Sequence, residues 1–167
     1  IDSIIKYGKI RLVGNLPYNI STEIMLWAFD RLELLEDMHF MFQKEFGERL
    51  SAKPNNKSYG RISVITQYLT ELEKVLYLEP DSFKPKPSVE SVFIRLKPKK
   101  DRHILSPTSI KLQEITKATF IHRRKMIGKS LKNILTAHQI EQLDIDLSLR
   151  PENLSVSDYV RIAEELI

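Results

Sequence analysis

The stretch that decides the fold is Arg11-Leu12-Val13-Gly14-Asn15-Leu16-Pro17-Tyr18-Asn19-Ile20-Ser21-Thr22. It predicts a short apolar strand, then a polar turn, then a helix with Ser21 or Thr22 as its N-cap. Asn15 and the residues after it would then lie at the carboxyl end of a strand. Open α/β sheets bind their ligands at this end, so the turn is the first candidate for a site.

The residue types in this turn suit a flat base that carries an exocyclic amine. The Asn15 amide oxygen can accept a hydrogen bond from such an amine, and so can a neighbouring backbone carbonyl whose direction Pro17 helps to fix. The Tyr18 ring can stack on the base. The competing interpretation is a simple turn followed by a core tyrosine, which is common for a four-residue match.

The pattern that follows predicts a parallel sheet. Glu23 to Leu35 has the composition of a helix buried on most of its circumference, Asp37 to Phe42 that of a strand, and Gln43 to Ser51 that of a second helix. Strand, helix, strand and helix in this order are typical of a βαβ unit. Residues 52–60 form a loop rich in turn formers, and Arg61 to Leu69 resumes as a helix.

Two further strands are predicted at Glu73 to Leu78 and Ser91 to Leu96. No helix separates them, so they should be antiparallel neighbours. The link contains three prolines, which predicts a stiff extended arm from Phe83 to Val89 with Phe83 at its tip. Phe83 could fill the core of a rigid connector, or it could stack on a base opposite Tyr18; the sequence leaves both open.

After residue 101 the strand pattern stops, and a small all-helical domain is expected over residues 102–167. Its helices are predicted from Ser106 to about Phe120, from Arg123 to Leu135, near Gln139 to Leu143, and from Ser155 to Leu166. Residues 1–101 would form the C-terminal part of a Rossmann-like α/β sheet. The domain boundary is therefore expected between residues 101 and 102.

The second of these helices is basic. Ile127, Leu131 and Ile134 would form its buried stripe, and lysines with the same spacing, two residues out of phase, would lie on the opposite, solvent-facing side. A phosphate backbone would suit such a surface, although a solvated face is the common alternative. The expected RNA-binding residues are Arg123, Arg124, Lys125, Lys129 and Lys132.

Composition excludes several classes of protein. The 167 residues contain no cysteine, which removes disulfides, thiolate catalysis and Cys-based zinc sites, and the four histidines lack metal-ligand spacing, so no metal is expected. No apolar run is long enough to span a bilayer and no signal peptide opens the chain, so an intracellular, cytoplasmic location is expected. The chain begins with Ile1 and has only five glycines and no Gly-x-Gly, which suggests a piece of a longer protein.

Four blocks together resemble a known family. They are Asn15 to Thr22, Phe83-x-Pro85-x-Pro87-x-Val89-x-Ser91, Phe120-x-x-Arg123-Arg124-Lys125, and Tyr59-Gly60-Arg61. In order and spacing the chain resembles the KsgA family of small-subunit rRNA adenine dimethyltransferases, from its first strand to its last helix. Members of that family transfer methyl groups from S-adenosylmethionine to adenine N6.

The resemblance implies a role for each block. Asn15, Leu16, Pro17 and Tyr18 would handle the target adenine and the transferring methyl, with Tyr18 and Phe83 holding the base and Asn15 also bordering the cofactor. The helical domain would dock on small-subunit rRNA or the pre-ribosomal small subunit. The family's glycine-rich cofactor motif has no counterpart here, so these 167 residues alone are expected to be inactive. The alternatives are an Erm-type large-subunit rRNA methyltransferase and a non-catalytic ribosome-assembly factor.

Overall fold

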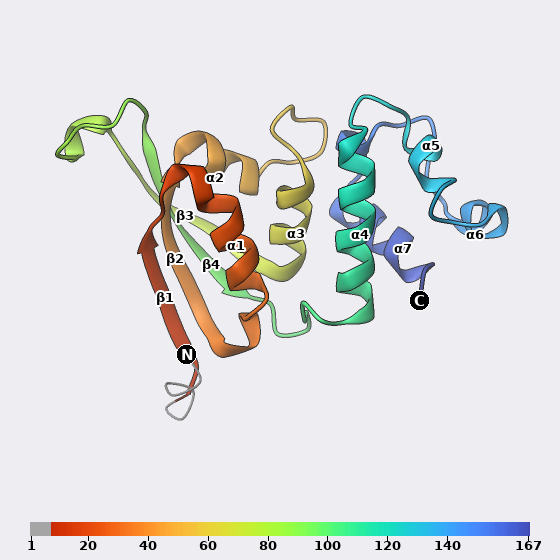
Figure 1. The fold of residues 1–167 in the computed structure, drawn as a ribbon, viewed down its shortest axis with the longest axis horizontal. Helices are drawn as coiled ribbons and strands as arrows, with labels where there is room; N and C mark the ends of the chain where they lie inside the picture. The colour runs from red at the N-terminus through yellow and green to blue at the C-terminus, as the bar shows by residue number, and fades with distance from the viewer. Residues whose placement is uncertain (1–7) are drawn as a thin grey trace. The chain divides into compact units, whose positions relative to one another are not determined.

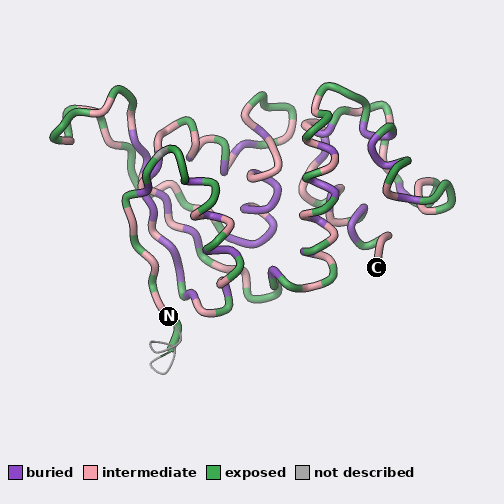
Figure 2. Tube along the Cα trace, in the orientation of Figure 1, coloured by how far each residue is buried: buried purple, intermediate pink, exposed green. Residues whose placement is uncertain are grey.

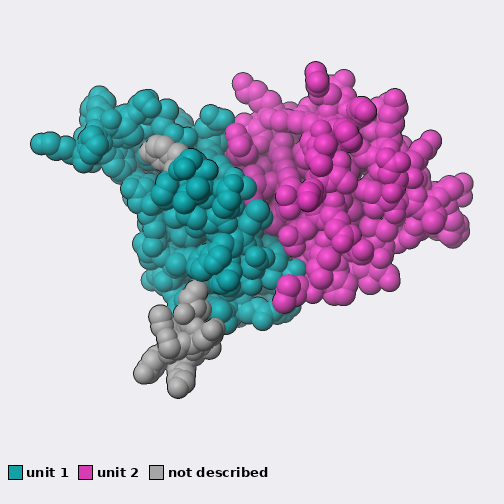
Figure 3. Space-filling model, in the orientation of Figure 1, with its two compact units in different colours: residues 1–48, 69–104 teal, residues 49–68, 105–167 magenta. Residues whose placement is uncertain are grey.

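The computed structural model describes residues 8–167, apart from the side chain of Tyr18. The chain divides into two compact units, coloured separately in Figure 3. The first unit comprises Ile1–Glu48 and Leu69–Ile104, and the second comprises Arg49–Tyr68 and Leu105–Ile167. Each unit is described by itself below.

The first unit is built on a four-stranded sheet, seen in Figure 1. Its strands are β1 (Ile10–Asn15), β2 (Leu35–Gln43), β3 (Thr70–Leu78) and β4 (Ser91–Pro98), in the order β1-β2-β4-β3. β1 and β2 are parallel, and the β2–β4 and β3–β4 pairs are antiparallel. The predicted parallel pairing of the first two strands and antiparallel pairing of the last two are thus confirmed. Because β3 runs parallel to β1 and β2, all three carboxyl ends lie at the same end of the sheet.

The two faces of this sheet differ in burial. Met38, Phe40 and Phe42 alternate along β2 on the face that carries helices α1 (Ser21–Phe29) and α2 (Lys44–Leu50), and all three are buried. Figure 2 shows buried residues along β2, whereas β1 has only exposed and intermediate ones. The opposite face is more open: Val13 on β1 is 63% exposed. Asn15 lies two residues from Val13 on the same strand and therefore on this open face.

Gly47 lets α2 pack closely on β4. A Cβ atom there would clash with Cγ1 of Val92 and lie 2.9 Å from Cδ1 of Ile94, and both side chains are fully buried. We expect Gly47→Ala to lower the free energy of unfolding by about 1–3 kcal/mol through overpacking, although Ala normally favours a helix. Gly60→Ala is the matched control, since nothing lies within 4 Å of its added Cβ. Urea unfolding of both variants measures the difference, and equal stabilities would contradict the packing argument.

The helix after β1 is shorter than expected. α1 ends at Phe29, and a 3-10 turn, Leu32–Leu34, leads into β2. Only one side of α1 is buried, because Trp27 is 40% exposed and the Arg31 guanidinium lies 4.7 Å from the centre of its ring. The predicted burial on most of the circumference is therefore wrong.

The second unit is helical. It contains α3 (Arg61–Leu69), α4 (Pro107–Ile121), α5 (Ile127–Leu131), α6 (Ala137–Gln142), the 3-10 turn Pro151–Asn153 and α7 (Val156–Glu164). Ser106 and Ser155, where two of these helices were expected to begin, are the N-caps of α4 and α7, since each side chain accepts a hydrogen bond from the backbone three residues on. Phe120 packs between the buried rings of Tyr59 and Tyr159, at centroid distances of 6.2 and 5.8 Å. This aromatic cluster forms part of the unit's core.

Residues 49–68 lie in the second unit, which differs from the expected division at residue 101. The loop before α3 carries Tyr59 into the aromatic cluster, and the Asn55 backbone N–H donates to the Glu152 carbonyl at 2.8 Å. The β-strand pattern of the sequence could not reveal these contacts, because they join segments that are 61 and 97 residues apart. The unit boundary after Ile104 lies close to the expected one.

The predicted helix from Arg123 to Leu135 is wrong in extent. α5 spans only Ile127–Leu131, and residues 122–125 form a turn. The backbone N–H groups of Ile127 and Gly128 donate to the carbonyls of Leu149 and Leu147, which starts the helix there. Gly128 permits this approach, since a Cβ would lie 3.1 Å from the Leu147 carbonyl oxygen.

Candidate functional site

The turn after β1 places Asn15 at the end of the sheet. Asn15 is exposed, and its side chain makes no hydrogen bond with the side chains and backbone that the structure describes, which leave out the Tyr18 side chain. The next residue is fixed: Leu16 is buried, and its N–H donates to the Met41 carbonyl of β2 at 3.2 Å. The turn thus presents a free amide from a backbone that is anchored to the neighbouring strand.

The two carbonyl groups that follow differ in availability. The Pro17 carbonyl accepts hydrogen bonds from Ser21 Oγ at 3.0 Å and from the Ile20 N–H at 3.3 Å. The Leu16 carbonyl accepts none from the described part of the chain. Of these two carbonyls, that of Leu16 is therefore the one open to a ligand.

Ser21 has a different role from the predicted one. The N-cap position of α1 is Ile20, and neither Ser21 nor Thr22 caps the helix. The Ser21 side chain is buried and points its hydroxyl back to Pro17. It therefore stabilises the turn that carries Asn15.

Phe83 lies at the same end of the sheet as Asn15, in the β3–β4 connection that projects from the sheet in Figure 1. The side chain of Tyr18, its expected partner across a base, lies outside the described residues. Phe83 is half-buried and makes no ring contact among those described. The predicted extended arm is not continuous, because the chain bends at residues 83–85 and again at residues 88–89.

The base of this arm is tied to the end of β2. The Lys44 N–H donates to the Glu90 carbonyl at 2.9 Å, and the Lys44 ammonium pairs with the Glu90 carboxylate. The hydrogen bond between the two side chains raises the pKa of Lys44 and lowers the pKa of Glu90. The connection that carries Phe83 therefore leaves the sheet from a fixed point.

A buried carboxylate, which the sequence analysis missed, holds three strands together on the open face. Asp37 on β2 accepts from Arg11 of β1 at 2.6 and 3.0 Å and from Arg95 of β4 at 3.0 and 3.2 Å. His39 Nε2 lies 3.3 Å from Asp37 Oδ1, although without hydrogen-bond geometry. Hydrogen bonding from Arg11 holds the pKa of Asp37 well below its usual range, against the opposing effect of burial. The available signal was an acid next to the apolar residues of this strand, although its neighbour Glu36 has the same charge and is exposed.

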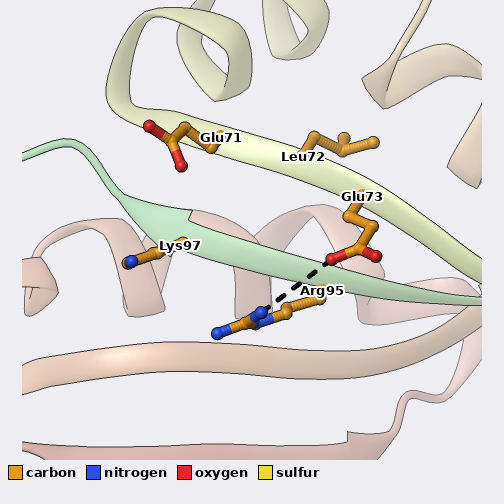
Figure 4. Close-up of a pocket in the computed structure, with 5 residues that line it drawn as sticks. All are labelled: Glu71, Leu72, Glu73, Arg95 and Lys97. Carbon is orange, nitrogen blue, oxygen red and sulfur yellow. Dashed lines mark ion pairs between the residues drawn. The ribbon is translucent and has the colours of Figure 1, made fainter.

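A shallow pocket on the same face lies away from the turn. Figure 4 shows its lining by charged side chains of β3 and β4. Arg95 Nη1 lies 3.9 Å from Glu73 Oε2 there, so the charges largely compensate one another. The pocket lies on β3 and β4, at one edge of the sheet, whereas Asn15 lies on β1, at the other edge. We assign it no part in the site. The lining residues are Glu71, Leu72, Glu73, Arg95 and Lys97.

The expected RNA-binding cations fall into two groups in the second unit. Lys125, Lys129 and Lys132 are exposed while Ile127 and Leu131 are buried, so the lysines lie away from the buried stripe as predicted. Arg124 is also exposed. Arg123, by contrast, donates from Nε to Glu152 Oε2 at 2.5 Å and from Nη2 to the Lys57 carbonyl. Its charge is therefore compensated within the protein.

The described residues do not by themselves make a site for S-adenosylmethionine. The residue best placed to border such a cofactor is Asn15, whereas the buried carboxylate Asp37 is fully occupied by two arginines. Between residues 8 and 167, no group of three His, Asp or Glu residues could hold a metal ion. The same residues include no helix long and apolar enough to cross a membrane.

The described fold is that of part of a Rossmann-like α/β sheet together with a helical unit. Comparison with solved structures agrees with this fold. A dimethyladenosine transferase from Plasmodium falciparum matches with a TM-score of 0.76 and 22% identity over 91% of this chain and 64% of its own. The 23S rRNA methyltransferase ErmE matches with a TM-score of 0.72 and 20% identity over 96% of this chain and 66% of its own.

The sequence identifies the family. Residues 3–167 match the model of the family described as ribosomal RNA adenine dimethylase, and the chain belongs to that family. Its relatives include a ribosomal RNA small subunit methyltransferase A of Buchnera aphidicola, 45% identical over 165 residues, and one of Tolumonas auensis, 42% identical over 166 residues. These alignments cover 96% and 99% of this chain but 59% and 62% of the relatives. The chain thus spans about three fifths of the length of these relatives.

Proposed function

We propose that this chain supplies the adenine-holding turn and the RNA-holding surface of an S-adenosylmethionine-dependent small-subunit rRNA adenine N6-dimethyltransferase, acting in the cytoplasm during ribosome biogenesis. The observation that carries the proposal is the free Asn15 amide beside the free Leu16 carbonyl. Two acceptors at the end of one strand match the two N–H groups of an adenine amine. Membership of the family and the names of its relatives support the same activity.

These residues are proposed to act by positioning the adenine amine for methyl transfer. Adenine N6 is a poor nucleophile, because its lone pair is delocalised into the ring. Acceptors at Asn15 Oδ1 and the Leu16 carbonyl would hold both N–H groups in a geometry that weakens this delocalisation and would stabilise positive charge developing on nitrogen. S-adenosylmethionine, when bound, supplies the methyl group. No general base is needed before the attack.

Tyr18 and Phe83 are proposed to stack on the target base once it leaves the RNA helix. Stacking on aromatic rings contributes about 1–3 kcal/mol per base, which helps to offset the cost of extruding a nucleotide. The half-buried Phe83 ring has surface available for this contact. Phe83→Ala should therefore weaken engagement of the base, whereas an effect on folding stability alone would favour the core role.

Methyl transfer to separated ribosomal RNAs tests the function and its alternatives. The protein should be a chain extended to the length of the relatives, supplied with labelled S-adenosylmethionine. We expect dimethyladenosine in small-subunit rRNA. Label in large-subunit rRNA alone would indicate the Erm-type activity, and binding without transfer to either RNA would indicate a non-catalytic assembly factor.

Lys129 and Lys132 should bind RNA through phosphates. We expect Lys129→Gln/Lys132→Gln to weaken binding of the 167-residue chain to small-subunit rRNA. Each lost contact should reduce the slope of log K against log salt by about 1, because fewer counterions are released. Filter binding between 50 and 300 mM salt gives the slopes. Lys97→Gln/Lys100→Gln removes the same charge from the first unit as a control, and an unchanged slope in the Lys129/Lys132 variant would leave those lysines as a solvated face.

A further inference from the structure

The loop before α3, residues 52–60, is held at both ends by side chains of α3. Gln67 Nε2 donates to the carbonyls of Leu50 at 3.1 Å and Ala52 at 2.8 Å. Ser63 Oγ donates to the Arg49 carbonyl at 2.6 Å and accepts from the Gly60 N–H at 3.0 Å. A surface loop with so many anchors has little conformational freedom left to lose on binding.

The middle of this loop is tied to the turn before α7. Asn55 adopts a left-handed conformation with φ of 68°. There its backbone N–H donates to the Glu152 carbonyl at 2.8 Å, and its side-chain oxygen accepts from Asn153 Nδ2 at 2.7 Å. A non-glycine residue at positive φ carries a conformational cost, which these two hydrogen bonds help to offset.

Arg123 joins the same loop to the turn that follows α4. Its Nη2 donates to the Lys57 carbonyl while its Nε binds Glu152, the residue whose backbone holds Asn55. Figure 1 shows the loop before α3 beside the carboxyl end of α4, in agreement with this contact. Because Glu152 compensates its charge, Arg123 is suited to position the two segments and not to receive a phosphate.

Four Lys and Arg side chains lie on the two segments that Arg123 joins, the loop before α3 and the turn after α4. All are exposed, and none forms an ion pair or hydrogen bond with another described side chain. They come from two stretches almost 70 residues apart, so neither stretch alone shows the cluster. Like charges held close together by a rigid backbone are unfavourable for stability but suit a polyanion. The four, named here the composite basic surface, are Lys53, Lys57, Arg124 and Lys125.

We infer that the composite basic surface is a preorganised contact for the phosphate backbone of folded rRNA, with Arg123 as its positioning residue. The inference rests on the proposed function and adds Lys53 and Lys57 to the RNA-binding residues while removing Arg123 from the direct phosphate ligands. Rigidity matters here because a loop that is already ordered pays little entropy when it binds.

The test is the affinity of the 167-residue chain for purified small-subunit rRNA across a salt series. Lys53→Gln/Lys57→Gln leaves every backbone anchor of the loop in place. We expect its salt slope to fall by about 2 and its affinity near 0.1 M salt to fall about 10- to 100-fold, whereas Lys97→Gln/Lys100→Gln should change both much less.

The outcomes separate this inference from the proposed function. If Lys53→Gln/Lys57→Gln binds like the wild type while Arg124→Gln/Lys125→Gln binds weakly, the loop is a solvated face and the inference is overturned, but RNA binding by the helical unit stands. If neither variant changes the slope, the inference is overturned, and RNA binding by the proposed function then depends on Lys129 and Lys132, which their own double variant tests.

The role of Arg123 is tested by a double-mutant cycle. We expect Arg123→Gln to weaken RNA binding in the wild type but to have almost no further effect on the salt slope in the Lys53→Gln/Lys57→Gln background, because it acts through the loop. Hydrogen exchange of the Asn55 amide should become faster in Arg123→Gln. A further fall of about 1 in the slope in that background would show that Arg123 itself binds a phosphate, which overturns its positioning role.

Discussion

Replacing Asp37 by Asn should lower the free energy of unfolding by about 2–3 kcal/mol, a large fraction of the stability of a small protein. The carboxylate is fully buried and accepts four hydrogen bonds from two arginines on either side of it. An amide of the same shape loses the charge and leaves Arg11 and Arg95 without their common partner. Since both guanidinium groups keep some contact with solvent, the cost stays below that of a charge stranded in the core. Thermal unfolding should show a midpoint roughly 4–12 °C lower.

The pH dependence of this difference has a definite sign. Because the pKa of Asp37 is lowered in the folded protein, its stabilisation is complete above the unfolded pKa of about 4 and is lost as the pH falls through the folded pKa. The difference in the free energy of unfolding between wild type and Asp37→Asn should therefore be constant near pH 7 and shrink below about pH 4. Asp81→Asn, which removes an exposed pair with Lys86, is the control and should cost less than about 1 kcal/mol. A difference in the free energy of unfolding that grows on acidification would contradict a stabilising role for the ionised Asp37 carboxylate.

The sequence predicted the sheet well, because its strands have strong local patterns. Apolar alternation located β2 and β4, and the lack of a helix between β3 and β4 correctly indicated an antiparallel pair. The helix boundaries were less predictable. Whether residues 122–125 continue a helix depends on hydrogen bonds from Ile127 and Gly128 to a segment about 20 residues further on. No local pattern reports such contacts.

The position of Asn15 was predictable from the sequence, but the hydrogen bonds of its neighbours were not. Asn15 stands where its motif placed it, at the end of a strand. The choice between the Leu16 and Pro17 carbonyls required the structure, because it depends on the rotamer of Ser21. Arg123 looked like its basic neighbours in the sequence, and only its contact with Glu152 distinguishes it.

Replacing Asn15 by Ala should slow methyl transfer by one to two powers of ten with little effect on RNA affinity. The variant removes one acceptor for the amine, and a hydrogen bond to a developing charge is worth about 1.5–3 kcal/mol. We expect folding to be unaffected, because Asn15 is exposed and its side chain makes no hydrogen bond with the part of the chain that the structure describes. Asn19→Ala is the matched control, since Asn19 is an exposed asparagine of the same turn.

The role of Asn15 is tested by single-turnover methyl transfer to small-subunit rRNA with a chain of the relatives' full length, measured beside RNA affinity. We expect Asn15→Ala to transfer methyl groups about 10- to 100-fold more slowly than wild type at unchanged RNA affinity, while Asn19→Ala should match wild type in both. Equal transfer rates for Asn15→Ala and wild type, or a loss of rate explained entirely by weaker RNA binding, would contradict the assignment of this turn as the adenine site.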